Sequence, residues 1–163
     1  MTPLQAFGAY PHLWERLDYQ ILRHGPIALY FQSAKLIEDI AWFQKHNYRI
    51  YQFDCQSWKS EIAFYDDARH ALNFPDYCRE SLDSFNDCLS GLPVSEKGGA
   101  VLEFRNFEVF AQRLPDVSHS ILDIIAVNSR GFLLTGRRFL ALVHSNDLNL
   151  KIESFGCCGV VHR

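Results

Sequence analysis

The chain has 163 residues, of which 48% are apolar, 14% aromatic and 21% charged, and its formal net charge at pH 7 is -3. These values exclude a disordered tail, a collagen and a coiled coil, and a chain of this length can bury a core of its own without disulfide staples. The small negative charge argues against nucleic acid as a direct partner, because phosphate binding requires a basic face.

Apolar runs alternate with amphipathic segments along the chain. The pattern predicts strands at 26–31, 49–53, 100–104 and 139–144, helices at 33–46, 57–72, 82–90, 106–114 and 116–130, and a C-terminal hairpin of 151–155 and 159–162. Strands that alternate with helices favour an α/β fold, a mainly parallel sheet with helices packed on it. We therefore expect a single domain, 1–163, with a strand–helix extension at 1–48, a core at 49–145 and the hairpin at 146–163.

Helical spacing also predicts which residues face the core and where helices begin and end. Ser33 and Asn106 are expected to cap helices, and Gly131 to close the last one. The residues expected on buried faces are Leu36, Ile37, Ile40, Phe43, Ile62, Tyr65, Ala68, Leu72, Ile121, Ile124 and Ile125.

The sequence contains no apolar run of the length of a membrane span. Met1–Leu4 has no basic segment followed by an apolar stretch, so we expect no secretion signal. We therefore expect a cytoplasmic protein with no membrane partner. The five cysteines are then expected to be reduced thiols.

Motifs for cofactors and catalysis are missing from the sequence, which has no Gly-rich nucleotide loop, no GxSxG elbow and no HExxH or CxxC pair. We expect no cofactor, no metal and no catalytic residue. Three weak candidates each have a plainer alternative. Cys157, Cys158 and His162 form either a zinc site or a turn of small residues; Cys55, Cys78 and Cys88 provide either a nucleophile or buried thiols; Arg137 and Arg138 form either an anion site or a solvated strand entrance. The plainer alternative is favoured in each case.

The acidity of the chain is concentrated in residues 49–108, which carry eleven acids and six bases. Within this part, Leu82, Phe85 and Leu89 share one face of the helix predicted at 82–90, and Asp83 and Asp87 share the opposite face. Like charges at positions i and i+4 repel each other. The pair is either an ordinary acidic solvent face or a surface that meets a cationic partner.

The segment 74–91, FPDYCRESLDSFNDCLSG, resembles the binding segment of the barstar family, small intracellular inhibitors of ribonucleases. The matching positions, in order and spacing, are Pro75, Tyr77, Leu82, Asp83, Asp87, Cys88 and Leu89. The order of the expected elements is similar to that family over about residues 49–145. The whole chain resembles the longer bacterial barstar-like proteins, which have an added strand–helix unit and a C-terminal hairpin.

The resemblance implies an inhibitor of the antitoxin or immunity type that binds a ribonuclease or nuclease toxin and is not an enzyme. Tyr77 would be a stacking platform, and Asp83 and Asp87 would mimic RNA phosphates in a basic cleft. The residues expected to touch the partner are Tyr77, Arg79, Glu80, Ser81, Asp83, Asn86 and Asp87.

Four positions depart from the family's pattern: Arg79 stands for a Gly, Ser81 for an Asn, Asn86 for an aromatic residue and Val127 for an acid. A positive charge at Arg79 opposes a basic partner, so these departures favour an alternative function, a barstar-like interaction module for a partner that is not a nuclease. An enzyme that uses the two carboxylates is a third alternative. It is disfavoured because a convex helix face lacks a concave pocket.

Overall fold

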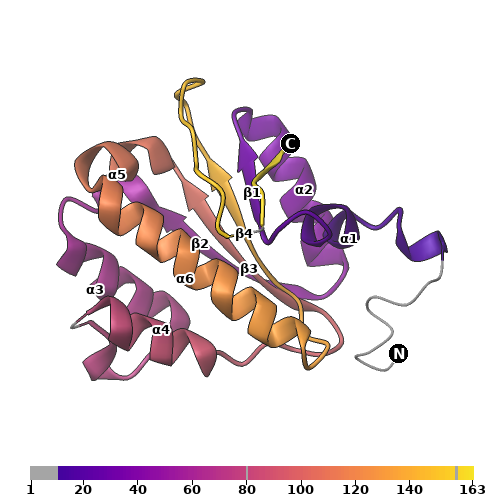
Figure 1. The fold of residues 1–163 in the computed structure, drawn as a ribbon, viewed down its shortest axis with the longest axis horizontal. Coiled ribbons are helices and arrows are strands. Elements are labelled where there is room, and N and C mark those ends of the chain that lie inside the picture. Colours follow the sequence, from indigo (N-terminus) through magenta and orange to yellow (C-terminus); the bar gives the residue numbers. More distant parts are fainter. Residues whose placement is uncertain (1–10, 80, 157) are drawn as a thin grey trace.

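The structure of the protein is a computed structural model that describes residues 11–79, 81–156 and 158–163 (Figure 1). A five-stranded sheet has the order β2-β3-β4-β1-β5, and every neighbouring pair is parallel. The strands are β1 (Ile27–Tyr30), β2 (Tyr48–Asp54), β3 (Gly99–Arg105), β4 (Phe139–His144) and β5 (Val161–His162). The helices are α1 (Leu17–Leu22), α2 (Ser33–Lys45), α3 (Glu61–Leu72), α4 (Leu82–Ser90), α5 (Phe107–Arg113) and α6 (Pro115–Leu133), with short 3-10 turns η2 (Pro11–Leu13), η3 (Cys55–Ser57) and η4 (Asp76–Arg79).

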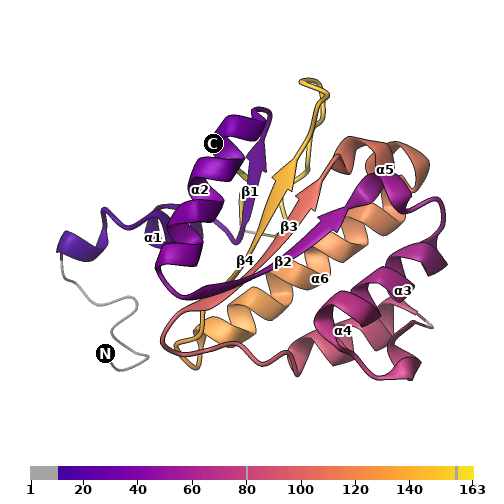
Figure 2. The same cartoon turned by 180° about the vertical axis from the view of Figure 1, so that it is seen from behind.

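The helices cover the two faces of the sheet unequally. Helices α3 to α6 lie on one face (Figure 1), and α2 packs on the other, with α1 beside it (Figure 2). Alternate strand residues therefore enter two separate cores, Leu102 and Phe104 on the first face and Val101 and Leu142 on the second. The expected α/β class with a parallel sheet is confirmed. None of the described helices is long and apolar enough to cross a bilayer.

The segment before residue 48 adds a strand to the same sheet. Strand β1 pairs with β4 through the register Ile27 to Ala141, and α2 covers the second core. Helix α1, which the apolar pattern did not predict, packs beside α2. The division into one domain with two extensions stays a prediction.

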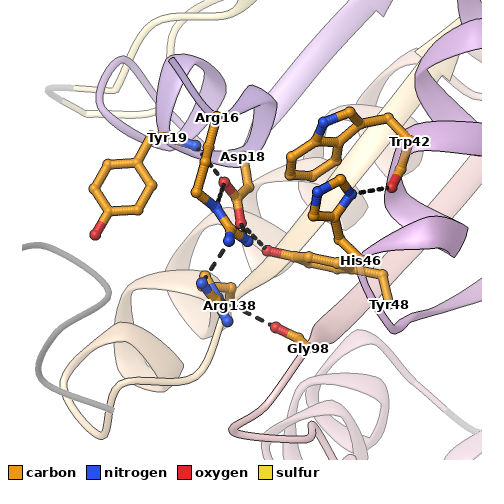
Figure 3. Close-up of polar contacts among 8 residues, drawn as sticks. All are labelled: Arg16, Asp18, Tyr19, Trp42, His46, Tyr48, Gly98 and Arg138. Carbon is orange, nitrogen blue, oxygen red and sulfur yellow. Dashed lines mark hydrogen bonds and ion pairs between the residues drawn. The ribbon is translucent and has the colours of Figure 1, made fainter. Parts of the chain in front are cut away.

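A buried ion cluster attaches α1 to the rest of the molecule (Figure 3). The Asp18 carboxylate is inaccessible and accepts hydrogen bonds from Arg16, at 3.0 and 3.1 Å, and from the Tyr48 hydroxyl, at 2.6 Å. The Arg138 guanidinium lies 3.5 Å from the same carboxylate and donates to the Gly98 carbonyl. Burial by itself would raise the pKa of Asp18, but the hydrogen bonds from Arg16 and Tyr48 outweigh it and lower this pKa.

Several expected boundaries and faces are wrong. Ile37 and Ile62 are exposed, by 57% and 65%, because each lies at the edge of its helix's apolar stripe rather than at its centre. Helix α3 begins at Glu61, where the Ser60 hydroxyl caps it, and α6 continues through Gly131 to Leu133. Ser33 is the first residue of α2 rather than its cap. Asn106 occupies the cap position of α5 but makes no side-chain cap hydrogen bond.

The expected C-terminal hairpin is also corrected. In place of a hairpin, the described residues show one antiparallel bridge, between Phe155 and Cys158. Residues Val161–His162 instead pair with β1 in parallel and extend the sheet, and the Arg163 guanidinium binds the Asp39 carboxylate of α2 at 2.9 and 3.2 Å. Without β5, strand β1 would be the edge of the sheet, and its outer backbone N–H and C=O groups would be unpaired. Pairing with residues Val161–His162 satisfies some of these groups, which explains why these residues join the sheet.

Candidate functional site

Helix α4 positions the two predicted carboxylates. The Ser81 hydroxyl accepts a hydrogen bond from the Ser84 backbone N–H at 3.1 Å, which caps the helix, and the chain leaves the helix at Gly91. Phe85, Cys88 and Leu89 are buried against the first core. Burial of this stripe fixes the rotation of the helix, so its opposite face must point outward.

Asp83 and Asp87 are both exposed, as the sequence predicts. Within the described part of the chain, neither carboxylate has a hydrogen bond or an ion pair. Asp83 still acts on its surroundings: burial, the hydrogen bond to Glu61 and the nearby Asp83 charge together raise the pKa of the Tyr65 hydroxyl. The face therefore presents two negative charges four residues apart that no described side chain pairs with, a surface suited to guanidinium and ammonium groups.

Tyr77 lies on η4, the turn that precedes α4. The residue is 56% exposed, while Phe74 and Cys78 on either side are buried. Asn73, in a left-handed conformation with φ of 55°, ends α3 and directs the chain into this turn. Buried neighbours thus hold a projecting aromatic ring on the segment that leads to the two acids.

A disulfide between Cys78 and Cys88 joins η4 to α4, with 6.3 Å between the Cα atoms. The expectation that all five cysteines are reduced is therefore wrong for these two. Cys88 lies on the buried face of α4, and the packing of η4 against α4 brings Cys78 to it. Cys55 is a free, buried thiol, and its burial raises its pKa. A raised pKa disfavours the reactive thiolate, as is typical of a structural cysteine.

Two further predicted contact residues have intramolecular roles. Asn86 is half-buried and accepts a hydrogen bond from the Asn128 amide of α6 at 2.8 Å, and the Ser81 hydroxyl caps α4. Val127, the neighbour of Asn128, is 51% exposed. Arg79 lies at the end of η4, and Glu80 lies outside the described residues.

The remaining candidates from the sequence give no second site. Arg138 is buried against Asp18, so the expectation of a solvated pair is wrong for it, whereas Arg137 lies over the Phe132 ring at 5.0 Å. Among the described residues, no three His, Cys, Asp or Glu side chains are grouped to hold a metal. Cys157, part of the weak zinc candidate, lies outside the described residues.

Two cavities lie apart from the acidic face. One of about 510 Å³ lies between α5, α6 and residues 147–153, and is lined by both apolar and polar side chains. Another of about 180 Å³ lies where β3 and β4 end, lined by Ser33, Arg105 and His144 among others. Neither is lined by Tyr77, Asp83 or Asp87, all three of which are exposed.

Comparison with known proteins identifies the core of the chain. A family model described as Barstar (barnase inhibitor) matches residues 48–144, more than half of the chain. No curated protein matches. The matched range begins with β2 and ends with β4, and it contains η4 and α4 with the two exposed carboxylates. The chain therefore belongs to the barstar family, and its core is a module of the ribonuclease-inhibitor type.

Proposed function

We propose that this protein is an inhibitor of the antitoxin or immunity type, which blocks the active site of a ribonuclease or nuclease toxin in the cytoplasm. Asp83 and Asp87 take the place of RNA phosphates, and Tyr77 stacks beside them. Arg79, Glu80, Ser81 and Asn86 are the further residues that we expect to touch the partner. The protein itself catalyses no reaction.

The observation that carries the proposal is the exposure of Asp83 and Asp87 without any intramolecular partner in the described chain. Two carboxylates at positions i and i+4 repel each other by a few tenths of a kcal/mol, and Asp87 lies late in its helix, where the helix dipole disfavours it. A cationic cleft would relieve both costs. The cleft of a ribonuclease is such a place, because it binds phosphates.

A direct test measures RNA cleavage by a panel of small ribonucleases, barnase and the nucleases encoded in the same genome included, with increasing amounts of the protein. We expect stoichiometric inhibition of at least one of them. The Asp83→Ala and Asp87→Ala variants should inhibit less. Glu38→Ala, which removes an exposed acid from α2 on the opposite face of the sheet, should inhibit normally. The protein without nuclease should cleave neither RNA, DNA nor esters.

An alternative function is a barstar-like interaction module whose partner is not a nuclease. The bond between Asn86 and Asn128 favours it, because Asn86 is occupied within the molecule, and so does the exposed apolar Val127 beside it. Binding of a protein partner through α4 without inhibition of any nuclease in the panel would select this alternative.

A further inference from the structure

We propose that Cys78 and Cys88 form a thiol–disulfide exchange site that controls partner binding: the oxidised protein presents a fixed binding surface, and the reduced protein binds more weakly. The proposal rests on the proposed function, because it concerns the same surface. It assigns a low-molecular-weight thiol and its disulfide, of the glutathione class, as the reactants.

The first argument for the proposal is the position of the disulfide in residues 74–91. It closes a loop between residues 78 and 88, a separation of 10 in sequence. Asp83 and Asp87 lie inside this loop, Asp87 next to Cys88, and Tyr77 lies immediately outside it, next to Cys78. The covalent bond therefore connects the turn that carries the aromatic ring to the helix that carries the two acids.

The two sides of this connection are not held equally well by other contacts. Helix α4 has its own anchors, since Phe85 and Leu89 are buried and Asn86 is bound to Asn128. Turn η4 has fewer. The Arg69 guanidinium reaches Asp76 at 3.2 Å, but that carboxylate is 90% exposed, and exposed ion pairs contribute little. Cleavage of the disulfide should therefore loosen η4 and Tyr77 and leave α4 and its acids in place.

The exchange reaction balances without any other reactant. A thiolate attacks one sulfur of the disulfide, the S–S bond breaks, and the second protein sulfur leaves as a thiolate. A second thiol then displaces the protein from the mixed disulfide. The protein has gained two electrons and two protons, and two thiols have become one disulfide; the reverse reaction oxidises the protein.

Because both cysteines are buried, a bound partner should change how fast the disulfide is reduced. Cys78 is 2% exposed and Cys88 is 8% exposed, so a thiol reaches the sulfurs only when η4 opens. A partner bound over Tyr77 holds η4 closed and slows reduction. By thermodynamic linkage, a partner that prefers the oxidised form also shifts the thiol–disulfide equilibrium toward that form, by the same factor.

The experiment equilibrates the full chain with oxidised or reduced glutathione and reads the state of each cysteine by alkylation and mass spectrometry. Limited proteolysis of the free protein then reports whether η4 opens. Affinity for the ribonuclease found in the inhibition panel is measured in both states. Reduction should free Cys78 and Cys88, raise cleavage within η4, and lower affinity by about three- to tenfold, the range expected from ordering one aromatic side chain and its turn on binding.

Three variants sharpen this test. Cys78→Ser/Cys88→Ser should bind like the reduced protein and ignore glutathione. Cys55→Ala, which removes a free thiol outside the segment, should keep the full response. Tyr77→Ala should bind with an affinity that hardly depends on the redox state, because the contact that reduction loosens is already gone.

The outcomes separate the two proposals. Equal affinity of the oxidised and reduced proteins, or failure of Cys78 and Cys88 to pair in oxidised glutathione, overturns the redox control and leaves the inhibitor function standing. A redox response that persists in Cys78→Ser/Cys88→Ser also overturns it. Absence of binding to every nuclease in both states overturns the proposed function and the redox control of it together, whatever proteolysis shows of the free protein.

Discussion

The Asn128 amide of α6 donates a hydrogen bond to the Asn86 amide oxygen of α4, with 2.8 Å between Nδ2 and Oδ1. The same Nδ2 also donates to the Ile124 carbonyl of its own helix at 2.9 Å. The side chain that fixes Asn86 is thus itself fixed. Since Asn86 precedes Asp87, this contact joins α6 to α4 directly beside the second carboxylate.

Asn128→Ala should weaken both folding and binding. Its loss leaves the half-buried Asn86 oxygen without its donor, and a hydrogen bond of this kind contributes about 0.5–1.5 kcal/mol to the free energy of unfolding. We expect the melting temperature to fall by about 2–4 °C, and affinity for the partner to fall by less than tenfold. The matched variants are Asn86→Ala and the double variant. A double variant as unstable as the sum of the two single variants would show that the two amides do not interact.

Asp87→Ala should separate binding from stability. Alanine is the better helix former by a few tenths of a kcal/mol, so the free energy of unfolding should stay level or rise slightly. Affinity for the partner should fall by about 2–5 kcal/mol, the range for truncating one side of a buried charge pair. Calorimetry and titration of the nuclease measure the two effects. A variant that melts earlier yet inhibits normally would make Asp87 a structural residue.

Salt should act on association more than on dissociation. Exposed charges more than about 8–10 Å apart are screened at physiological ionic strength, and steering of a basic partner toward the acidic face depends on such charges. We expect the association rate constant to fall by about tenfold between 50 and 500 mM NaCl, with a smaller change in dissociation. Stopped-flow mixing measures both. An association rate that ignores salt would instead favour an apolar contact and the alternative function.

Asp18→Asn should destabilise the whole molecule, although it lies outside the family core. It leaves the Arg138 guanidinium, which is 1% exposed, without its counter-ion. Breaking a buried pair in this way costs about 3–5 kcal/mol of unfolding free energy. Urea unfolding measures the change. Arg16→Gln serves as the control, because the Arg16 side chain is partly exposed and its loss should cost less. Equal stability of Asp18→Asn and the natural protein would show that the ion pair of Asp18 and Arg138 does not stabilise the fold.

Acid should destabilise the protein through His144. Burial lowers the pKa of this imidazole below its ordinary 6.5, although Glu108 and Glu103 oppose the shift and Arg105 adds to it. Its Nδ1 lies 3.4 Å from the Asn106 backbone N–H, which can only donate, so the neutral ring carries its proton on Nε2, toward the Ser33 hydroxyl.

The sign of the His144 effect follows from the direction of its shift. The unfolded chain binds the proton more readily than the folded one, so stability should decline as the pH falls below about 6.5 and should stop declining below the folded pKa. Urea midpoints between pH 7.5 and 5 measure it. His144→Gln should flatten the decline, and His70→Gln, at an exposed position of α3, should leave it unchanged.

The sequence by itself determined the order of the elements from β1 to β4, the parallel sheet and the outward direction of Asp83 and Asp87. Each of these depends on local periodicity, because a buried stripe of Phe85 and Leu89 fixes what the opposite helix face must be. The family motif added Tyr77 to the same surface. Periodicity was weakest at the margins of stripes, where Ile37 and Ile62 are exposed.

Only the tertiary structure decided the contacts between distant segments. Cys78 meets Cys88, Arg138 meets Asp18, Asn128 meets Asn86, and β5 joins β1. The sequence does not indicate whether a polar or thiol side chain faces water or a buried partner. Which of these it faces depends on how helices and strands pack against one another, and that packing is fixed by the burial of all the apolar faces together.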